Sequence, residues 1–411
     1  MKQTPDSTRG SSAEPPSPGA PSFARVFKWL GPALALTSVI AALGFVEIGL
    51  RVALDDQQQQ HLPHFGLSGD MQARLAWLDW QARRDKYGTT SYPSSFDEPD
   101  PELGWRIKPD VEVLHVKPGI YEVDVTTNNR GMRGLRPVRA RKRAGTTRVG
   151  VFGCSQTFGE TVNDEETYVS VLDERVDAAQ FLNFGVRGYG TDQMLLYYEN
   201  DADAYDLDVV VLGFAFYHMK RNDSGFLFYA KPYFTLDEDG ELELSGLPVP
   251  TPEQLEAEVR NASTWRLADN SVLMRWLWQK VRNLGSPDLY SETGDAWALT
   301  GALIERFADS ASAAGSRVVV MNIDEGHPEL EDDLQALTDE LGVGLVNLGP
   351  VLRAAGERGV PYTLPADNHW NAEGHRIVAD TLEQYLCTET MPGACERGQR
   401  AGDAQNNPDY S

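Results

Sequence analysis

Two stretches of this chain carry the side chains that an acyl-transfer reaction needs. In GCSQTFGE, residues 153–160, Ser155 follows an apolar run and a glycine. In LPADNHWNAEGH, residues 364–375, Asp367 and His369 are two positions apart, so in an extended strand their side chains lie on the same side. A serine becomes nucleophilic when a histidine takes its proton and a carboxylate orients that histidine. We therefore predict Ser155 as nucleophile, His369 as base and Asp367 as the orienting acid.

Each of these stretches also has a plainer interpretation. Ser155 could be an ordinary helix N-cap, which is the commonest use of a serine before a helix. The second stretch could be a polar loop before a capped helix, or a metal site formed by Asp367, His369 and His375. The metal site lacks an obvious fourth ligand, and His375 suits a helix that packs on a sheet. We therefore expect no metal and no cofactor.

The third stretch, NFGVRGYGTDQ at residues 183–193, contains three glycines, the middle one being Gly188. Glycines permit positive φ and close approach of the backbone to a ligand. At the carboxyl edge of a parallel sheet such a loop would line a binding crevice. A phosphate-binding loop is disfavoured because the run lacks both GxGxxG and the lysine of a P-loop.

Alternating strands and helices are expected to position these residues. The short apolar runs cover residues 148–153, 180–185, 208–216, 316–323 and 342–348. Helix-like segments cover 165–178, 191–201, 295–314, 329–340 and 371–386. Continuous Val- and Leu-rich runs are typical of strands buried on both faces, and this alternation predicts a parallel sheet covered by helices on both sides.

Together the three stretches resemble conserved blocks of the SGNH/GDSL hydrolase superfamily, over about residues 147–388. Gly153, Ser155 and Thr157 match the first block, with Cys154 in place of its aspartate, and the glycine loop resembles the second block. The Asp367 and His369 stretch resembles the fifth. The resemblance implies a three-layer α/β/α fold with a five-stranded, flavodoxin-like parallel sheet. It also implies a serine esterase whose oxyanion site includes the backbone N–H groups of Ser155 and Gly188.

Two features depart from that family pattern. The acid lies two residues before the histidine instead of three, as in the similar Asp-x-His-Trp pattern of polysaccharide O-acetyltransfer proteins. The third block usually supplies an oxyanion asparagine, but here the chain reads GFAFYHMKRN. Tyr217, His218 or Asn222 would have to donate instead, and we predict Tyr217 as the donor.

The N-terminal region predicts a membrane anchor. Residues 29–46 carry no charge, and a spanning helix needs about 20 mostly apolar residues. Basic residues precede the run, which places the N-terminus in the cytosol and the remainder in the periplasm or outside the cell. A cleavable signal peptide is the alternative, but no clear cleavage site follows. The segments EIGLR, DPELGWRIKP and NNRGMRG also resemble a membrane-anchored bacterial subgroup of the superfamily.

We therefore expect five regions along the chain. Alternating residues around Pro118 and Gly119 predict a β-hairpin before the main domain, and Asp239-Gly240 predicts a second hairpin inside an insertion. The expected regions are a disordered tail (1–26), the anchor (27–50), a linker helix with a small β-rich segment (51–146), the α/β domain (147–388, insertion about 223–290) and a polar tail (389–411).

Composition narrows the function further. The 411 residues carry a formal charge of −24 with no long basic stripe, which argues against binding to nucleic acid. Three cysteines exclude a disulfide scaffold, although Cys387 and Cys395 could pair with each other in an oxidising compartment.

Three functions remain open. The first is an anchored esterase or deacylase that acts on an acylated carbohydrate or a small ester. The second is an O-acyltransferase that acts on a surface polysaccharide through the same three side chains. The third is a non-catalytic envelope- or carbohydrate-binding module on the same fold, which the missing asparagine favours and the presence of Ser155, Asp367 and His369 opposes.

Overall fold

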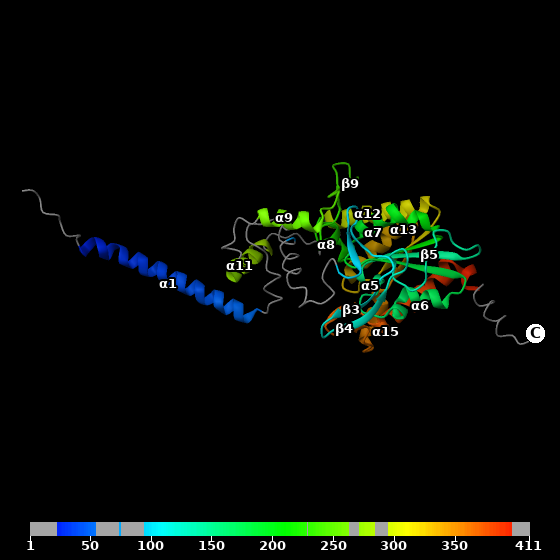
Figure 1. The fold of residues 1–411 in the computed structure, drawn as a ribbon, viewed down its shortest axis with the longest axis horizontal. Coiled ribbons are helices and arrows are strands. Elements are labelled where there is room, and N and C mark those ends of the chain that lie inside the picture. The colour runs from blue at the N-terminus through cyan, green and yellow to red at the C-terminus, as the bar shows by residue number, and fades with distance from the viewer. Residues whose placement is uncertain are drawn as a thin grey trace, which may run out of the picture. The chain divides into compact units, whose positions relative to one another are not determined.

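The computed structural model describes residues 23–54, 74, 94–227, 229–262, 271–283 and 295–396. The chain divides into two compact units (Figure 1). The smaller contains the N-terminal helix α1 and helix α11, and the larger contains the sheet and everything packed on it. Residues 1–22 of the expected tail, most of the expected linker helix and residues 397–411 lie outside the described residues, and residues 23–26, also expected in the tail, belong to helix α1.

Helix α1 (Phe23–Ala53) is long and apolar enough to cross a membrane. Its segment Leu34–Ala53 has a mean hydropathy of 1.7, which suits either a signal anchor or a signal peptide. Within the same unit, Glu47 accepts hydrogen bonds from the backbone N–H groups of Val272 and Leu273, at 2.9 and 2.7 Å. These residues begin helix α11 (Val272–Asn283), so the carboxylate satisfies N–H groups that a helix start leaves unpaired.

The larger unit is built on a five-stranded parallel sheet of order β11-β10-β7-β5-β6. All five predicted strands are present, at β5 (Thr147–Gly153), β6 (Ala179–Gly185), β7 (Val209–Phe214), β10 (Arg317–Asn322) and β11 (Gly344–Asn347). Every residue of β7 is buried, as expected for a central strand covered on both faces. The predicted α/β fold with a five-stranded parallel sheet is confirmed, and its strand order is that of flavodoxin-like folds.

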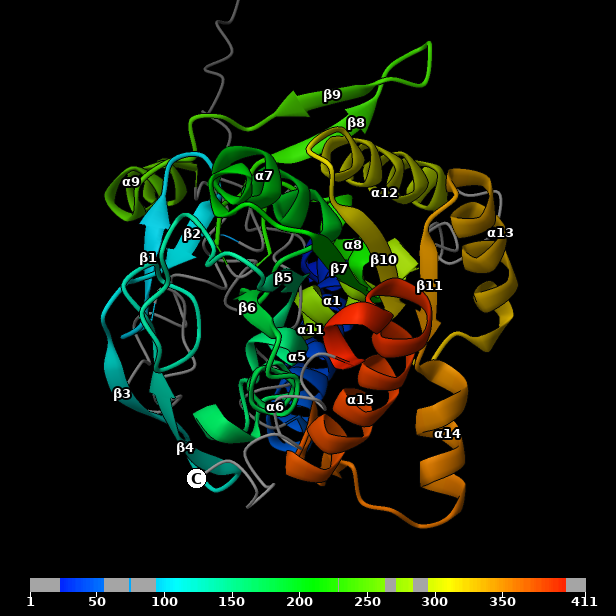
Figure 2. The same ribbon diagram turned by 90° about the vertical axis from the view of Figure 1, so that its right-hand side faces the viewer.

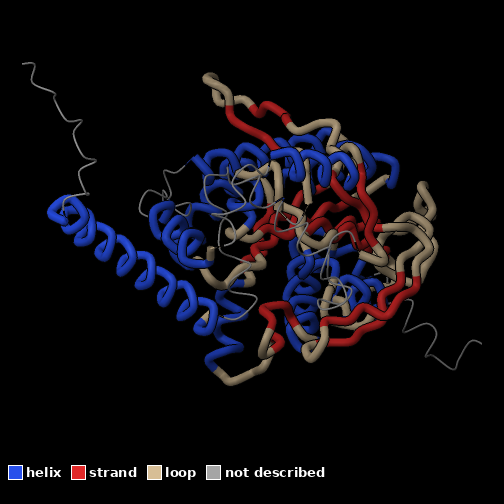
Figure 3. Tube along the Cα trace, turned by 60° about the vertical axis from the view of Figure 1, so that its left-hand side comes forward, coloured by secondary structure: helices blue, strands red, loops and turns tan. Residues whose placement is uncertain are grey.

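Helices cover both faces of this sheet. Figure 2 shows α7 and α12 on one side and α6 and α15 on the other, and Figure 3 shows the central strands between helices. The main helices are α6 (Tyr168–Arg175), α7 (Thr191–Asp201), α12 (Asp295–Ala313), α13 (Glu331–Leu341) and α15 (Ala372–Tyr385). Helix α14 (Gly349–Glu357) was not predicted, because its Gly-Pro start is also typical of a turn; proline is favourable in the first turn of a helix.

The β-rich segment before the sheet belongs to the same compact unit as the sheet. It contains two antiparallel pairs, β1 (Asp97–Asp100) with β2 (Gly104–Ile107), and β3 (Glu112–Lys117) with β4 (Tyr121–Thr126). The second pair is the predicted hairpin, and Gly119 at its turn has φ +76°. The core side chains of this segment, including Phe96, Trp105 and Val125, join the same hydrophobic cluster as the sheet.

The short helix α8 (His218–Asn222) follows β7, and the insertion after it contains the hairpin β8 (Tyr233–Leu236) with β9 (Leu242–Ser245), and helix α9 (Pro252–Ala262). The predicted turn at Asp239-Gly240 is present, with Gly240 at φ +85°.

At the carboxyl end, α15 runs into a π-helical turn (Leu386–Thr390) and Cys387 is bonded to Cys395. Met391 and Ala394 are buried in the core. The folded unit therefore extends to residue 396, past the boundary expected at 388.

Candidate active site

The turn after β5 places Ser155 at the edge of the sheet. Gly153 ends the strand, and Ser155 begins the short helix α5 (Ser155–Phe158). A Cβ at Gly153 would lie 2.0 Å from the Thr157 hydroxyl oxygen, so only glycine permits this tight turn. Ser155 keeps 6% of its surface exposed, and its hydroxyl contacts the histidine described next.

Strand β13 (Asp367–Trp370) brings the predicted base and acid to that serine. The Nε2 atom of His369 lies 2.7 Å from Ser155 Oγ, and Nδ1 contacts Asp367 Oδ1. The same carboxylate oxygen accepts the backbone N–H of His369 at 3.0 Å. With the Nδ1 proton directed at Asp367, Nε2 is left to accept the hydrogen of the Ser155 hydroxyl. The structure thus brings the three predicted residues together, although 214 residues separate Ser155 from His369.

A glutamine beside the serine joins the two stretches. The side-chain amide of Gln156 donates to the Asn368 carbonyl at 3.1 Å, and its oxygen accepts the Trp370 N–H at 3.0 Å. These bonds pair Gln156 with the backbone of β13 on both sides of His369. The bonds from Gln156 to the backbone of β13 therefore help to fix the distance between Ser155 and His369, in addition to the direct contact between those two side chains.

The glycine loop after β6 lies next to residues of the β-rich segment. Gly188 has φ +80°, a conformation that strains any residue with a Cβ. The indole N–H of Trp105 donates to the Arg187 carbonyl at 2.9 Å, and the Tyr189 hydroxyl donates to the Trp105 carbonyl. Among the described residues, neither the Ser155 N–H nor the Gly188 N–H donates to a protein group, which leaves both as candidate oxyanion donors.

The altered third block places only one of its three candidate donors beside the serine turn. Tyr217 is half-buried and its hydroxyl lies 3.2 Å from the sulfur of the buried Cys154; burial, with Cys154 nearby, raises the pKa of Tyr217 well above its usual value. The fully buried His218 accepts the Ala215 N–H through Nδ1, at 3.2 Å.

Asn222 is also fully buried, and its amide binds Thr300 at 3.0 Å. His218 and Asn222 thus serve the local fold.

Two charged residues that the sequence did not reveal contact the predicted triad. Lys117, at the end of β3, places its ammonium 2.6 Å from Asp367 Oδ2. Glu160 has a carboxylate oxygen 3.6 Å from His369 Nε2. Burial on its own would raise the pKa of Asp367, but the hydrogen bonds from His369 and Lys117 hold it well below its usual value.

Glu160 belongs to a buried network of charges under the histidine. Its carboxylate lies 3.1 Å from the Arg187 guanidinium and 3.5 Å from His115 Nε2. Arg187 also contacts Asp97 and is fully buried. Burial would raise the pKa of Glu160, but Arg187, His115 and His369 together hold it well below its usual value. A buried carboxylate beside Nε2 is therefore present as an anion.

The alternative metal site is not formed. His375 is buried in α15, stacks on Tyr168 with ring centroids 5.9 Å apart, and accepts the Tyr168 N–H at 3.2 Å. Burial lowers its pKa to about 3, so it is a neutral core histidine. Within the described part of the chain, no group of three His, Cys, Asp or Glu residues is arranged to hold a metal ion.

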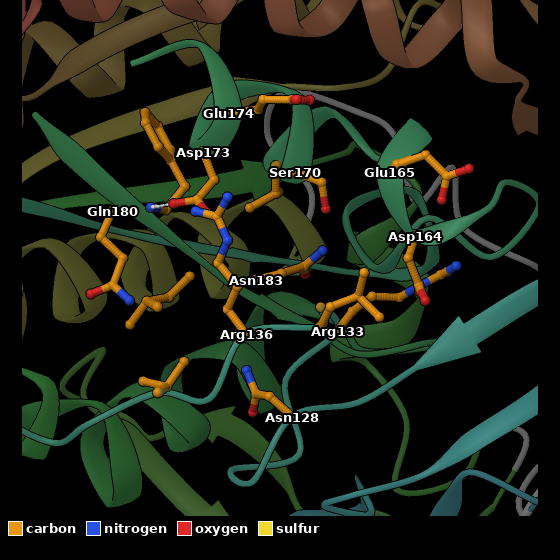
Figure 4. Close-up of a pocket in the computed structure, with 16 residues that line it drawn as sticks. Asn128, Arg133, Arg136, Asp164, Glu165, Ser170, Asp173, Glu174, Gln180 and Asn183 are labelled. Carbon is orange, nitrogen blue, oxygen red and sulfur yellow. Dashed lines mark hydrogen bonds and ion pairs between the residues drawn. The ribbon is translucent and has the colours of Figure 1, made fainter. Parts of the chain in front are cut away.

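A hollow of about 230 Å³ lies elsewhere on this unit (Figure 4). Its lining includes Arg133, paired with Asp164, and Arg136, paired with Asp173. None of Ser155, Asp367 and His369 lines it. The candidate site therefore lies outside this hollow.

No protein-family model and no curated protein sequence matches the chain. Among solved structures, the chain is similar to a lipolytic protein of the G-D-S-L family from Veillonella parvula, with 14% identity over 59% of this chain and 100% of that one, at a TM-score of 0.35. It is also similar to an esterase from Pseudoalteromonas, with 11% identity over 58% and 96% of the two chains, TM-score 0.35. A third is an acetylxylan esterase from Geobacillus stearothermophilus, with 11% identity over 61% and 98%, TM-score 0.34.

Proposed function

We propose that this chain is a serine esterase or deacylase in which Ser155, His369 and Asp367 form the catalytic triad. The observation that carries the proposal is the 2.7 Å contact between His369 Nε2 and Ser155 Oγ, made while Nδ1 of the same ring contacts Asp367. Nucleophile, base and orienting acid within hydrogen-bond reach of one another are the signature of an activated serine.

The reaction follows from these contacts. Ser155 Oγ attacks the ester carbonyl carbon while His369 Nε2 takes the hydroxyl proton, and the carbonyl oxygen becomes an oxyanion. The N–H groups of Ser155 and Gly188 donate to that oxyanion, with the Tyr217 hydroxyl as a third donor. The ester C–O bond then breaks, and the leaving alcohol takes the proton from Nε2. Water enters, gives a proton to Nε2 and attacks the acyl carbon, and the proton returns to Ser155 as the acid leaves.

The substrate class we propose is an acylated carbohydrate or a small ester. No cofactor is required, because each proton moves only between Ser155, His369, the leaving alcohol and the attacking water. We further propose that α1 is an uncleaved anchor and that the esterase unit lies outside the cytosol, because Arg25 and Lys28 precede the apolar run.

Labelling with a fluorophosphonate tests the proposal. The reagent should modify the wild-type chain at Ser155, mapped by mass spectrometry of the labelled peptide, and should leave Ser155→Ala and His369→Ala unmodified. The matched control is Ser170→Ala, a part-buried serine in α6 whose hydroxyl binds Thr167 and not a histidine; it should label like the wild type. A folded wild-type chain that does not react, or that reacts at another serine, would refute the esterase assignment and favour a binding module.

A further inference from the structure

The β3–β4 hairpin turns one face toward the active site. Side chains alternate between faces along a strand, so His115 and Lys117 lie on the same face, and directly opposite residues of the partner strand share it. Those opposite residues are Val123 and Tyr121 respectively. His115 is fully buried and Val123 is 7% exposed, so this is the inward face.

Lys117 is the last residue on that inward face, beside the turn. Its side chain keeps 38% of its surface, but the ammonium lies 2.6 Å from Asp367 Oδ2, and the Asp367 side chain is only 7% exposed. The two oxygens of Asp367 are therefore divided, with Oδ1 on the histidine and Oδ2 on the lysine. The ammonium on Oδ2 restricts the rotation of the Asp367 carboxylate. It also offsets part of the negative charge that would stabilise a protonated His369 imidazole.

We propose that Lys117 is a positioning residue of the active site, which orients Asp367 and weakens the attraction of that carboxylate for positive charge on His369. The inference rests on the proposed function, and it adds to the triad a residue 250 positions from Asp367 in the chain. The charge on Lys117 acts through Asp367, because the ammonium binds the carboxylate and not the reacting serine.

Other charges that face the histidine act in both directions. The anion Glu160 favours the imidazolium, while Arg187 opposes it from behind Glu160. His375 adds no charge, because burial lowers its pKa to about 3, and burial lowers the pKa of His115 below its usual value. Of the groups in direct contact with Asp367 or His369, Lys117 is the one cation among the described residues. The direction in which the removal of Lys117 shifts the pH profile of activity can therefore be predicted.

The test compares Lys117→Met with wild type over pH 5 to 9, using hydrolysis of an activated ester by the full chain in detergent. Without the ammonium, Asp367 stabilises the imidazolium more strongly. The low-pH fall in kcat/KM should therefore move upward by about half to one pH unit. Because the carboxylate also loses the contact that fixes its rotation, kcat should fall about three- to tenfold with KM nearly unchanged. Lys117→Arg should restore both. Lys142→Met, which removes a lysine paired with Asp208, is the control and should leave the profile unchanged.

A second measurement does not depend on turnover. Diethyl pyrocarbonate reacts with imidazole only in its neutral form, and the His369 side chain is 27% exposed. The pH midpoint of the modification of His369, mapped by mass spectrometry, should rise in Lys117→Met by the same amount as the activity profile. An unchanged midpoint would overturn the inference, as would a lower kcat with no shift of the profile. If Ser155→Ala hydrolyses the ester as fast as wild type, the proposed function itself is refuted, and the role of Lys117 with it.

Discussion

Replacing Arg187 with methionine should expose how strongly the buried charges beneath the active site depend on one guanidinium. Arg187 is fully buried, lies 3.1 Å from a carboxylate oxygen of Glu160, contacts Asp97, and stacks over the Phe96 ring at 4.3 Å. Methionine fills part of the volume but leaves both carboxylates without their cation. Removing one partner of a buried ion pair costs about 3–5 kcal/mol, and we expect a loss of about 4 kcal/mol in the free energy of unfolding at pH 7.

The loss in the free energy of unfolding of Arg187→Met should decrease as the pH falls. In the wild type the pKa of Glu160 is held well below its usual value. The ionised carboxylate therefore contributes to the free energy of unfolding above the unfolded pKa of about 4.3, and this contribution is lost as the pH falls through the folded pKa. In Arg187→Met the burial of Glu160 is no longer opposed by the guanidinium, and its folded pKa should rise above about 4.3. Protonation of Glu160 then removes an uncompensated buried charge from the variant, so the destabilisation of Arg187→Met relative to wild type should be smaller at pH 5 than at pH 7.

Urea unfolding of the full chain in detergent, followed by tryptophan fluorescence, measures both effects. Trp105 is a suitable probe because it is 1% exposed and its indole binds the Arg187 carbonyl. Arg136→Met, which breaks an exposed pair with Asp173, is the control and should cost less than about 1 kcal/mol at either pH. Adding Glu160→Gln to Arg187→Met should recover part of the loss. A cost below about 1 kcal/mol at pH 7, or an equal cost at both pH values, would refute this account of the network.

Two further predictions concern the oxyanion site and the anchor. Tyr217→Phe should lower kcat about 10²-fold with little change in KM, because its hydroxyl would act only in the transition state; full activity would assign the oxyanion to backbone N–H groups alone, and Cys154→Ala would show whether the thiol contact at 3.2 Å matters. Fusions of a reporter that is active only outside the cytosol, placed after Arg51 and after the last residue, should both be active; an inactive fusion at either place contradicts the proposed orientation.

Local sequence pattern was sufficient to predict the sheet, and it singled out Ser155, Asp367 and His369, which the structure places together. Val-rich runs such as 209–214 are strands because they are buried on both faces. Ser155 and His369 were recognisable because each lies in a short block with a strand or a capped helix beside it. Helix α14 was missed because its glycines and proline are equally typical of turns.

The charges around the triad were not predictable in the same way. Lys117 and Glu160 act on residues 250 and more than 200 positions away in the chain, and no periodicity encodes which hairpin docks on which loop. The alternation that predicted the hairpin also placed His115 and Lys117 on one face. A lysine on an apolar-facing side of a strand was therefore the available signal, but its carboxylate partner follows only from the tertiary fold.

The span of the chain that these contacts bridge bears on how the protein folds. Within the sheet, β5 and β6 pair Val149 with Phe181, 32 positions apart, and β7 and β10 pair Val210 with Val318, 108 positions apart. The contacts of Ser155 with His369 and of Lys117 with Asp367 span 214 and 250 positions. Closing longer loops costs more chain entropy, and contacts of long range form slowly. The active site is therefore expected to assemble after the sheet, when the last strand and the hairpin dock together. A chain that has formed its sheet but not yet docked strand β13, which carries His369, would be compact and inactive, so Ser155 would stay unreactive until folding is complete.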